Sequence, residues 1–483
     1  IPGASAFSLR EDVRSPVDGK PVGVVMNATT QNVSEAVDAA RKGFKVWSKM
    51  PVETRSKMLE KAGDLLEKNR DHFLALLSRE AGKTLDDGVS EIREAVDFCR
   101  FYAREAVKSF GEPIALPGPT GEDNRLAHRG RGVFVCISPW NFPLAIFAGQ
   151  VVAALAAGNA VLAKPAEQTP LVAQEMVKIL HEAGVPKDAL LFVPGDGRVG
   201  AALTSHPKID GVCFTGSTET AWAINRTLAA KNGPIVPLIA ETGGMNAMIV
   251  VATALPEQVA DDVVSSAFRS AGQRCSALRL LFVQEDVAER MLDMIEGAAR
   301  ELKMGDPMHL HTDIGPVIDA DQLAMLNGHI ATMRKSQKVR FAAKAPEGGL
   351  FFGPHIVEMT KADALEREIF GPVLHVVRYK AGGLDKVLDQ IEATGFGLTL
   401  GIHTRIEDTV RKVTERLDTG NIYVNRNMIG AVVGTQPFGG SGLSGTGFKA
   451  GGPHYLLRFA LEQVVSVNTA AAGGNASLIA MGE

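Results

Sequence analysis

Apolar residues recur with two different periods along the chain, and the change of period divides the chain into parts. In the first third the spacing is the roughly 3.6 residues of an amphipathic helix. The first stripe of this kind comprises Val33, Ala36, Val37, Ala40, Phe44 and Trp47. We expect Asn32 to be the N-cap of this helix, with Glu35 three residues later. Similar stripes over residues 59–77 and 92–102 predict two further helices.

From residue 132 onward, short apolar runs alternate with helical patterns. Strands are predicted at 132–137, 159–163, 189–193, 211–214 and 235–240, with helices between them at 144–157, 170–183, 199–205 and 219–231. This alternation predicts a parallel sheet covered by helices on both faces. A second alternation predicts a separate α/β domain beginning near Met245. Its strands lie at 247–251, 278–283, 371–379, 398–403 and 421–424, and its helices at 256–270, 288–302, 384–393 and 406–417.

The carboxyl ends of the first set of strands are polar and rich in glycine. In a parallel sheet these ends are where ligands bind, and small residues there suit a nucleotide cleft. The ends read Ser138-Pro139-Trp140-Asn141, Lys164-Pro165-Ala166-Glu167, Gly195-Asp196-Gly197, Thr215-Gly216-Ser217 and Glu241-Thr242-Gly243-Gly244.

Composition excludes several classes of protein. The 483 residues carry a net charge of −4 and 22% charged side chains, with no basic stretch to collect the phosphates of a nucleic acid. No apolar run reaches 18 residues, so no membrane span is expected. The four cysteines show neither a disulfide framework nor paired zinc spacing, and the scattered histidines suggest no metal site. A reducing cytoplasm fits best.

The two ends of the chain predict a fragment. The sequence opens Ile1-Pro2 without Met and closes in a tail of small residues, 470–483. We therefore expect a partner domain upstream.

Cys275 and Glu241 are the strongest candidates for chemistry. A thiol and a carboxylate beside small-residue turns suit covalent capture of a carbonyl, followed by attack of activated water on a thioester. The polar neighbours Gln273, Arg274 and Ser276 suggest a cationic setting that lowers the pKa of the thiol. Local context alone leaves a core residue at a domain edge equally open. The other cysteines, Cys99, Cys136 and Cys213, lie on apolar stripes or in apolar strands and are expected in the core.

Three other motifs are weaker. Gly195–Gly200 matches G-x-G-x-x-G between a strand and a helix, but the acid expected about 20 residues later is missing. Lys164 and Glu167 could hold ribose hydroxyls, although an ordinary surface pair is as good an interpretation. The run Gly439–Gly447 lacks the ending of a P-loop and is expected to be a crossing loop.

Taken together, the motifs resemble the aldehyde dehydrogenase superfamily, in order and across nearly the whole chain. The segments that carry this resemblance are residues 138–143, 164–167, 214–219, 241–244, 272–275, 368–372 and 437–440. A closer resemblance is to the pyrroline-5-carboxylate (L-glutamate γ-semialdehyde) dehydrogenase domain of the bifunctional proline utilization A family. It rests on residues 433–440, 451–455, 467–469 and 475–477. Thr242 departs from the Leu found in many members, which leaves the carboxylate of Glu241 unaffected.

The resemblance implies an α/β fold with two doubly wound domains. A Rossmann-type NAD-binding domain would comprise residues 1–122 and 137–243, and a catalytic domain residues 244–445. A small β oligomerisation element would comprise residues 123–136 and 446–483, with a protruding hairpin at 124–135 that pairs with a neighbour in a homo-oligomer. An upstream proline dehydrogenase domain is also implied.

The resemblance further implies the chemistry. Cys275 would attack the aldehyde, the Asn141 side chain and the Cys275 backbone N–H would stabilise the oxyanion, and Glu241 would activate the water that hydrolyses the thioester. NAD would accept the hydride. Its expected contacts are Ile137, Ser138, Pro139, Trp140, Lys164, Ala166, Glu167, Gly197, Gly200, Phe214, Thr215, Gly216, Ser217, Thr242, Gly243, Glu368 and Phe370. The expected substrate contacts are Phe142, Arg274, Ser276, Gly430, Ala431 and Phe438.

The expected reaction is oxidation of L-glutamate γ-semialdehyde to L-glutamate in proline catabolism. Two alternatives stay open at this point. One is a hydrolytic aldehyde dehydrogenase for another small aldehyde, such as succinate semialdehyde. The other is a catalytically silent member kept for assembly, against which the intact Cys275, Glu241 and Asn141 argue.

Overall fold

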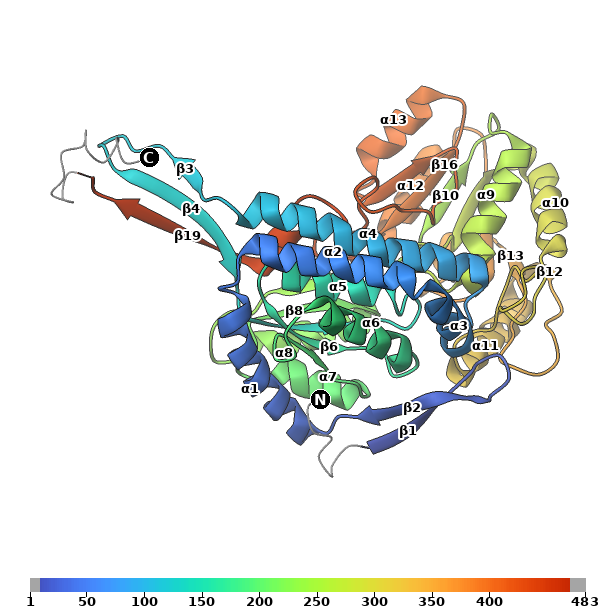
Figure 1. Ribbon diagram of the computed structural model, residues 1–483. Helices are drawn as coiled ribbons and strands as arrows, with labels where there is room; N and C mark the ends of the chain where they lie inside the picture. Colours follow the sequence, from blue (N-terminus) through green and yellow to red (C-terminus); the bar gives the residue numbers. More distant parts are fainter. Residues whose placement is uncertain (1–8, 470–483) are drawn as a thin grey trace.

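The computed structural model describes residues 9–469 and contains two α/β units and a projecting sheet (Figure 1). The expectations about the chain start, the tail 470–483 and the motif at 475–477 lie outside the described residues. The described chain begins with a hairpin of β1 (Leu9–Arg14) and β2 (Pro21–Asn27), followed by the helices α1 (Thr30–Trp47), α2 (Val52–Lys68), α3 (Arg70–Ala81) and α4 (Leu85–Phe110). Among the helices described, none is long and apolar enough to cross a bilayer.

The first unit is a five-stranded parallel sheet in the order β7-β6-β5-β8-β9. Its strands are β5 (Val133–Ile137), β6 (Ala160–Lys164), β7 (Leu190–Phe192), β8 (Gly211–Thr215) and β9 (Leu238–Glu241). Alternate residues of β5 enter different cores. Phe134 and Cys136 pack with α2, α4, α5 (Ala145–Ala156) and α6 (Pro170–Ala183), whereas Val133 and Val135 pack with α1, α7 (Gly197–Ser205) and α8 (Thr218–Ala229). The predicted doubly wound sheet is confirmed.

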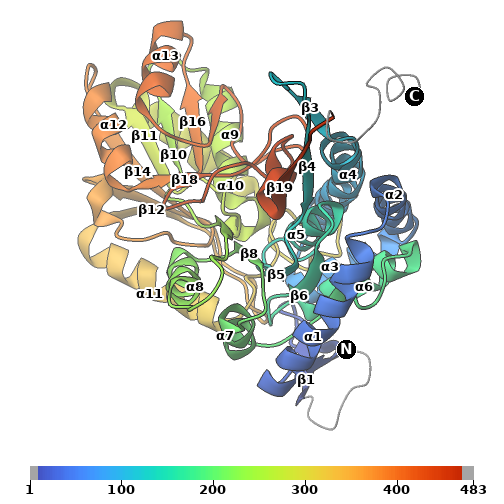
Figure 2. The ribbon, with the colours of Figure 1, turned by 90° about the vertical axis from the view of Figure 1, so that its left-hand side faces the viewer.

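The second unit is a seven-stranded sheet in the order β12-β13-β14-β11-β10-β16-β17, parallel except for β12. Its strands are β10 (Ala247–Val250), β11 (Leu280–Gln284), β12 (Lys338–Ala342), β13 (His355–Met359), β14 (Val373–Tyr379), β16 (Thr399–His403) and β17 (Asn421–Val424). Its helices are α9 (Pro256–Phe268), α10 (Glu285–Glu301), α11 (Ala320–Ser336), α12 (Leu384–Ala393) and α13 (Glu407–Arg416). Figure 2 shows the two sheets on opposite sides of the molecule.

The third sheet, in the order β19-β4-β3, projects from the rest of the chain (Figure 1). Its strands β3 (Ile114–Leu116), β4 (Asp123–Gly130) and β19 (Ala460–Val467) are antiparallel. The predicted boundaries of this element are wrong at two points: residues 133–136 belong to β5 in the first sheet, and β3 belongs to the projecting sheet. The physical reason is that β4 is polar and only partly buried, whereas residues 133–136 are a buried apolar run.

The start of α1 also differs from the prediction. The N-cap is Thr29, whose hydroxyl accepts from the N–H of Asn32, while the Asn32 side chain accepts from the N–H of Thr29. Asn32 is therefore the N3 partner of a capping box that lies one turn earlier than expected, and Glu35 has no part in it.

Two mid-helix glycines allow a matched test of how α1 packs. A methyl group at Gly43 of α1 would overlap the backbone of Asp188 and Ala189, whereas one at Gly297 of α10 would meet nothing. We expect Gly43→Ala to lower the free energy of unfolding by about 1–3 kcal/mol, and Gly297→Ala to raise it by about 0.4–1 kcal/mol. Urea denaturation of both variants checks this, and equal effects would contradict the close contact.

Candidate active site

Cys275 follows an unusual turn between α9 and β11. Ser270, Ala271 and Gly272 all have positive φ angles, of 57°, 53° and 65°. Only glycine adopts this region without strain, and a non-glycine residue there costs about 1–3 kcal/mol. The surrounding structure must therefore hold the turn in place.

Asp87 of α4 provides that restraint. Its side chain is buried, and its Oδ2 accepts from Ser270 Oγ at 2.8 Å. Its Oδ1 accepts from Arg269 Nε and from Arg274 Nη2, each at 2.8 Å. Burial alone would raise the pKa of Asp87, but Arg274, Lys83 and Arg269 bring that pKa well below its usual range. Asp87 therefore stays ionised and holds the turn through its carboxylate. We call this arrangement the clamp.

The same helix also holds the segment that carries Asn141. Glu91, one turn after Asp87, accepts through Oε1 from the N–H groups of Leu144 and Ala145, at 2.8 and 3.2 Å. Its Oε2 lies 2.7 Å from Lys83 Nζ, and both side chains are buried. Asn141 Nδ2 donates in turn to Gln273 O at 3.1 Å. One face of α4 therefore fixes Asn141 and the turn of Cys275 against each other.

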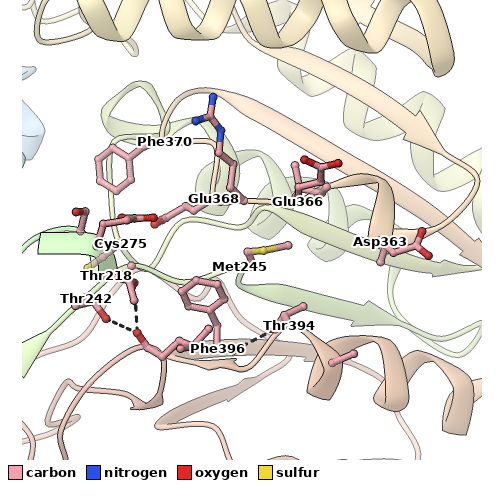
Figure 3. Close-up of a pocket in the computed structure, with 18 of the residues that line it drawn as sticks. Thr218, Thr242, Met245, Cys275, Asp363, Glu366, Glu368, Phe370, Thr394 and Phe396 are labelled. Atoms are coloured by element: carbon pink, nitrogen blue, oxygen red, sulfur yellow. Dashed lines mark hydrogen bonds between the residues drawn. The ribbon is translucent and has the colours of Figure 1, made fainter. Parts of the chain in front are cut away.

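A cavity of about 1100 Å³ lies between the two sheets and reaches Cys275 and Asn141. It brings together many of the predicted cofactor contacts, namely Pro139, Trp140, Thr215, Gly216, Ser217, Thr242, Gly243, Glu368 and Phe370. Figure 3 shows Cys275, Glu368 and Phe370 close to one another on its wall, with Asp363 at a distance from them. The predicted contacts that do not line it are Ile137, Ser138, Lys164, Ala166, Glu167, Gly197, Gly200 and Phe214.

Glu368 and Phe370 line the cavity close to Cys275 (Figure 3). Burial raises the pKa of Glu368 to about 7, opposed by Arg279 and by the N–H of Gly244. A methyl group at Gly243 would overlap the Glu368 carboxylate, so this glycine makes room for it. The ring of Phe370 meets Trp140 edge-on, with centroids 5.5 Å apart.

Lys164 and Gly200 are brought together outside this cavity. Lys164 Nζ donates to Pro165 O at 2.9 Å and lies 3.9 Å from Glu167 Oε2. A methyl group at Gly200 would touch the Lys164 stem at 3.5 Å, so α7 packs against that stem. Burial lowers the pKa of Lys164, and Glu167 and Asp196 oppose this shift. The motifs at 164–167 and 195–200 thus form one neighbourhood.

Glu241 ends β9 and turns its carboxyl toward the glycine-rich loop. Its Oε2 accepts from the N–H of Gly440 at 3.1 Å, and its buried Oε1 has no hydrogen-bond partner among residues 9–469. A side chain at Gly439 or Gly445 would press on this carboxyl group. Burial raises the pKa of Glu241 to about 8, opposed by Gly440, Arg458 and Lys449. Such a group can accept a proton only in its minor, ionised form at neutral pH.

The ionisable groups that act on Cys275 are acidic side chains, contrary to the predicted cationic setting. Burial, together with Glu368, Glu241 and Glu94, raises the pKa of its thiol to about 12. Arg274 does not compensate, because its guanidinium donates to Asp87, Ser270 Oγ and Ile429 O. The expectation that Arg274 lowers the thiol pKa was therefore wrong.

The predicted substrate contacts lie outside the cavity between the sheets. The Phe142 ring is 3.8 Å from Lys83 Nζ and 5.2 Å from the Arg274 guanidinium. Through Ile429 O, Arg274 also reaches the loop that continues into Gly430 and Ala431. Ser276 is buried next to the thiol. Phe438 pairs with Ala450 in an isolated bridge.

Several functional candidates on α4 were not predicted from the sequence. Asp87, Glu91 and Glu94 are acidic residues spaced by four and three along the helix; Asp87 and Glu91 are buried, and Glu94 is partly buried. Burial and Glu91 raise the pKa of Glu94 to about 7, whereas Arg274 and Lys83 lower it. Glu94 also contributes to the raised pKa of the Cys275 thiol, which makes it a further candidate. The signal in the sequence was the run of acids interrupting an apolar stripe.

Comparisons with known proteins identify the family of the chain. The model of the aldehyde dehydrogenase family matches residues 5–465. The bifunctional protein PutA of Klebsiella aerogenes is 51% identical over 461 residues, which cover 93% of this chain and 34% of that protein. The chain thus spans 34% of the length of this curated relative.

Solved structures give the same result. A crystal structure of a bifunctional proline utilization A (PutA) protein superposes with a TM-score of 0.92 at 66% identity, covering 93% of this chain and 46% of that one. The 1-pyrroline-5-carboxylate dehydrogenase from Thermus, solved with bound NAD, has a TM-score of 0.92 at 35% identity, covering 95% of this chain and 90% of that one.

Asp86 and Asp87 offer a matched pair for testing the clamp. We expect Asp87→Asn to lower the free energy of unfolding by about 3–5 kcal/mol, because it leaves buried arginine charge uncompensated. Asp86 is 79% exposed and contacts only the outer side of Arg269, so Asp86→Asn should cost at most about 1 kcal/mol. Urea denaturation, with alkylation of Cys275 by iodoacetamide as a second readout, measures both. Similar losses in the two variants would contradict the role of Asp87.

Proposed function

Because the chain belongs to the aldehyde dehydrogenase family, we propose that it oxidises L-glutamate γ-semialdehyde to L-glutamate with NAD as the hydride acceptor. The observation that carries the proposal is the cavity in which Cys275, Asn141 and the cofactor contacts Glu368 and Phe370 meet. The relatives named for 1-pyrroline-5-carboxylate dehydrogenase and for proline utilization A support the choice of aldehyde.

The residues on the cavity wall fit NAD. Thr215–Ser217 lie at the carboxyl end of β8 and at the N-terminus of α8, where backbone N–H groups would receive a pyrophosphate. Glu368 would hold the nicotinamide ribose, and Phe370 would pack beside the ring. Lys164 and Glu167 would take the adenosine ribose. When bound, NAD supplies an acceptor for hydride and a positive charge close to the thiol.

The resting thiol is protonated, and cofactor binding is expected to change that. The three carboxylates Glu368, Glu241 and Glu94 raise the pKa of Cys275, and a cationic ring beside them would lower it. The N–H of Ser276 also favours the thiolate. The reactive anion would then be more abundant in the loaded enzyme than in the free enzyme.

Cys275 Sγ would bond to the aldehyde carbon, and the carbonyl oxygen would become an oxyanion. Asn141 Nδ2 has two N–H groups and uses one on Gln273 O, which leaves the other for this oxyanion together with the N–H of Cys275. Removing one such donor typically costs about 2.7–4 kcal/mol of transition-state stabilisation. After hydride departure, Glu241 would take a proton from water, whose oxygen attacks the thioester and expels the thiol.

Charge favours a substrate that carries an α-amino acid group. The carboxylate of Glu94 lies within electrostatic range of Cys275 and would pair with the α-ammonium group. The substrate carboxylate would bind Ser276 and the N–H groups of Gly430 and Ala431, and Phe142 and Phe438 would clasp the stem. The second candidate, succinate semialdehyde, has no ammonium group and would leave Glu94 unused.

The wider setting belongs to the same proposal. We propose a role in proline catabolism, an upstream proline dehydrogenase domain and a cytoplasmic location; the bifunctional relatives support the first two. We also propose that the projecting sheet forms a homo-oligomer, because Ile114, Val464 and Val465 are more than half exposed on it.

Pre-steady-state kinetics distinguishes the role of Cys275 as nucleophile from the role of Glu241 as base. Cys275→Ala should give no NADH while still binding NAD, because only the nucleophile is lost. Glu241→Gln should give one burst of NADH and then stall at the thioester. Stopped-flow absorbance and calorimetry measure these results, and steady turnover by Glu241→Gln would remove Glu241 from the role of base.

Glu241 also predicts the pH dependence of the hydrolytic step. Its pKa is raised to about 8, so below that pH the carboxyl is protonated and accepts no proton. Thioester hydrolysis should therefore rise with pH through about 8 and then level off. The slow phase of Glu241→Gln should lack this rise.

Glu94 predicts selectivity between the two candidate substrates. We expect Glu94→Gln to raise KM for glutamate γ-semialdehyde by about 10- to 100-fold, the value of one charge-assisted hydrogen bond. Activity toward succinate semialdehyde should be unchanged or improved, since that aldehyde brings no ammonium group. Asp97→Asn, an exposed change on the same helix, is the control. A parallel loss with both aldehydes would show that Glu94 has only a structural role.

A further inference from the structure

Arg279 is a fully buried arginine four residues after the thiol, at the entry to β11. Its backbone is fixed on both sides. The N–H of Arg279 donates to Asn246 O at 3.0 Å, and its carbonyl accepts from the N–H of His375 at 3.0 Å. These two hydrogen bonds fix the backbone of Arg279 just before β11, and this determines where its guanidinium lies.

The Arg279 guanidinium bridges two segments that are far apart in the sequence. Its Nη1 donates to Gly272 O at 2.8 Å, and its Nη2 donates to Arg274 O at 2.9 Å, so both carbonyls belong to the turn that presents Cys275. On the other side, Nη1 donates to Gly371 O at 3.1 Å and Nη2 lies 3.5 Å from Glu368 Oε1.

Two further contacts bring the same segments together. The guanidinium carbon of Arg279 lies 5.1 Å from the centre of the Phe370 ring. A methyl group at Gly272 would overlap the backbone of Gly371 and Pro372, so the two segments touch only because Gly272 has no side chain. Residues of both segments therefore form this contact: the turn that precedes Cys275 (the thiol turn) and the segment that carries Glu368 and Phe370.

We infer that Arg279 is a positioning residue that sets the distance between the Cys275 sulfur and the nicotinamide seat formed by Glu368 and Phe370. This inference rests on the proposed function, since it assumes hydride transfer at that seat. A planar guanidinium places several N–H groups in a rigid fork, which the single ammonium of lysine does not reproduce. Hydride transfer is sensitive to such placement, and an error of about 1 Å can cost about 100-fold in rate.

Two reactions of the same thiol distinguish positioning from mere support. Hydride transfer needs the thiol and the nicotinamide at the correct distance from each other, which we call their register. Acylation of Cys275 by p-nitrophenyl acetate, with release of p-nitrophenolate, needs the thiol alone. Loss of fold, or loss of thiol activation, would slow both reactions together. Loss of register slows only the first.

The decisive variant is Arg279→Lys, which keeps the charge and removes the fork. We expect the NADH burst with glutamate γ-semialdehyde to slow by about 10- to 100-fold, while acylation in the absence of cofactor stays near the wild-type rate. The control is Arg55→Lys, another buried arginine, whose bonds to Met50 O and Ala156 O lie away from both segments. It should change neither reaction.

A second variant keeps Arg279 in place. Gly272→Ala should force the thiol turn away from Gly371 and give the same selective loss of the burst, whether or not Arg279→Lys folds. Parallel losses of both reactions, or an unchanged burst, in a folded variant would overturn the inference. A wild-type protein that gives no burst at all would instead count against the proposed function, whereas a normal wild-type burst with an unchanged variant burst counts against Arg279 alone.

Discussion

The buried carboxylate of Asp87 is the constraint on which the site depends. The turn before Cys275 places Ser270 and Ala271 in a left-handed conformation, at a cost of about 1–3 kcal/mol each. The Asp87 carboxylate accepts hydrogen bonds from Ser270, Arg269 and Arg274. A hydrogen bond to a charged group stabilises the folded state by about 1.5–3 kcal/mol. The two effects are of similar size, so the turn persists because a helix from the first unit supplies an anion to a loop of the second.

The arrangement of charge around the thiol has a functional consequence. Carboxylates surround Cys275, and the nearest arginine charges are already bonded to Asp87 and to backbone carbonyls. A thiol in this setting is mostly protonated, and a cation in the cavity would increase the fraction of it that is ionised. Under the proposed function, the cofactor would supply that positive charge, so the thiolate would be more abundant when the hydride acceptor is present. Arg279 adds a geometric link between the same two partners.

Much of the fold was predictable because burial is periodic. The helices at 170–183 and 384–393 and the strand at 421–424 match α6, α12 and β17 residue for residue, since each has a continuous apolar face or core run. Elements with little buried surface were missed. Only Leu326, Ile330 and Met333 are buried in α11, and β12 is an edge strand with no buried residue. The projecting sheet was misplaced for the same reason, because the pattern of β4 is polar on both faces.

The sequence by itself determined the two α/β units, the strand ends that carry Asn141 and Glu241, and the identity of the thiol. These depend on local periodicity and on short motifs, which are written in consecutive residues. Only the tertiary structure decided what surrounds that thiol. Asp87 and Glu94 lie far from Cys275 in the sequence. Asp87 binds the turn before Cys275 and Glu94 acts on its thiol because α4 packs across both units, and Arg274 is neutralised by its contact with Asp87. The charge on a buried group depends on neighbours that are close in space, and no spacing along the chain records them.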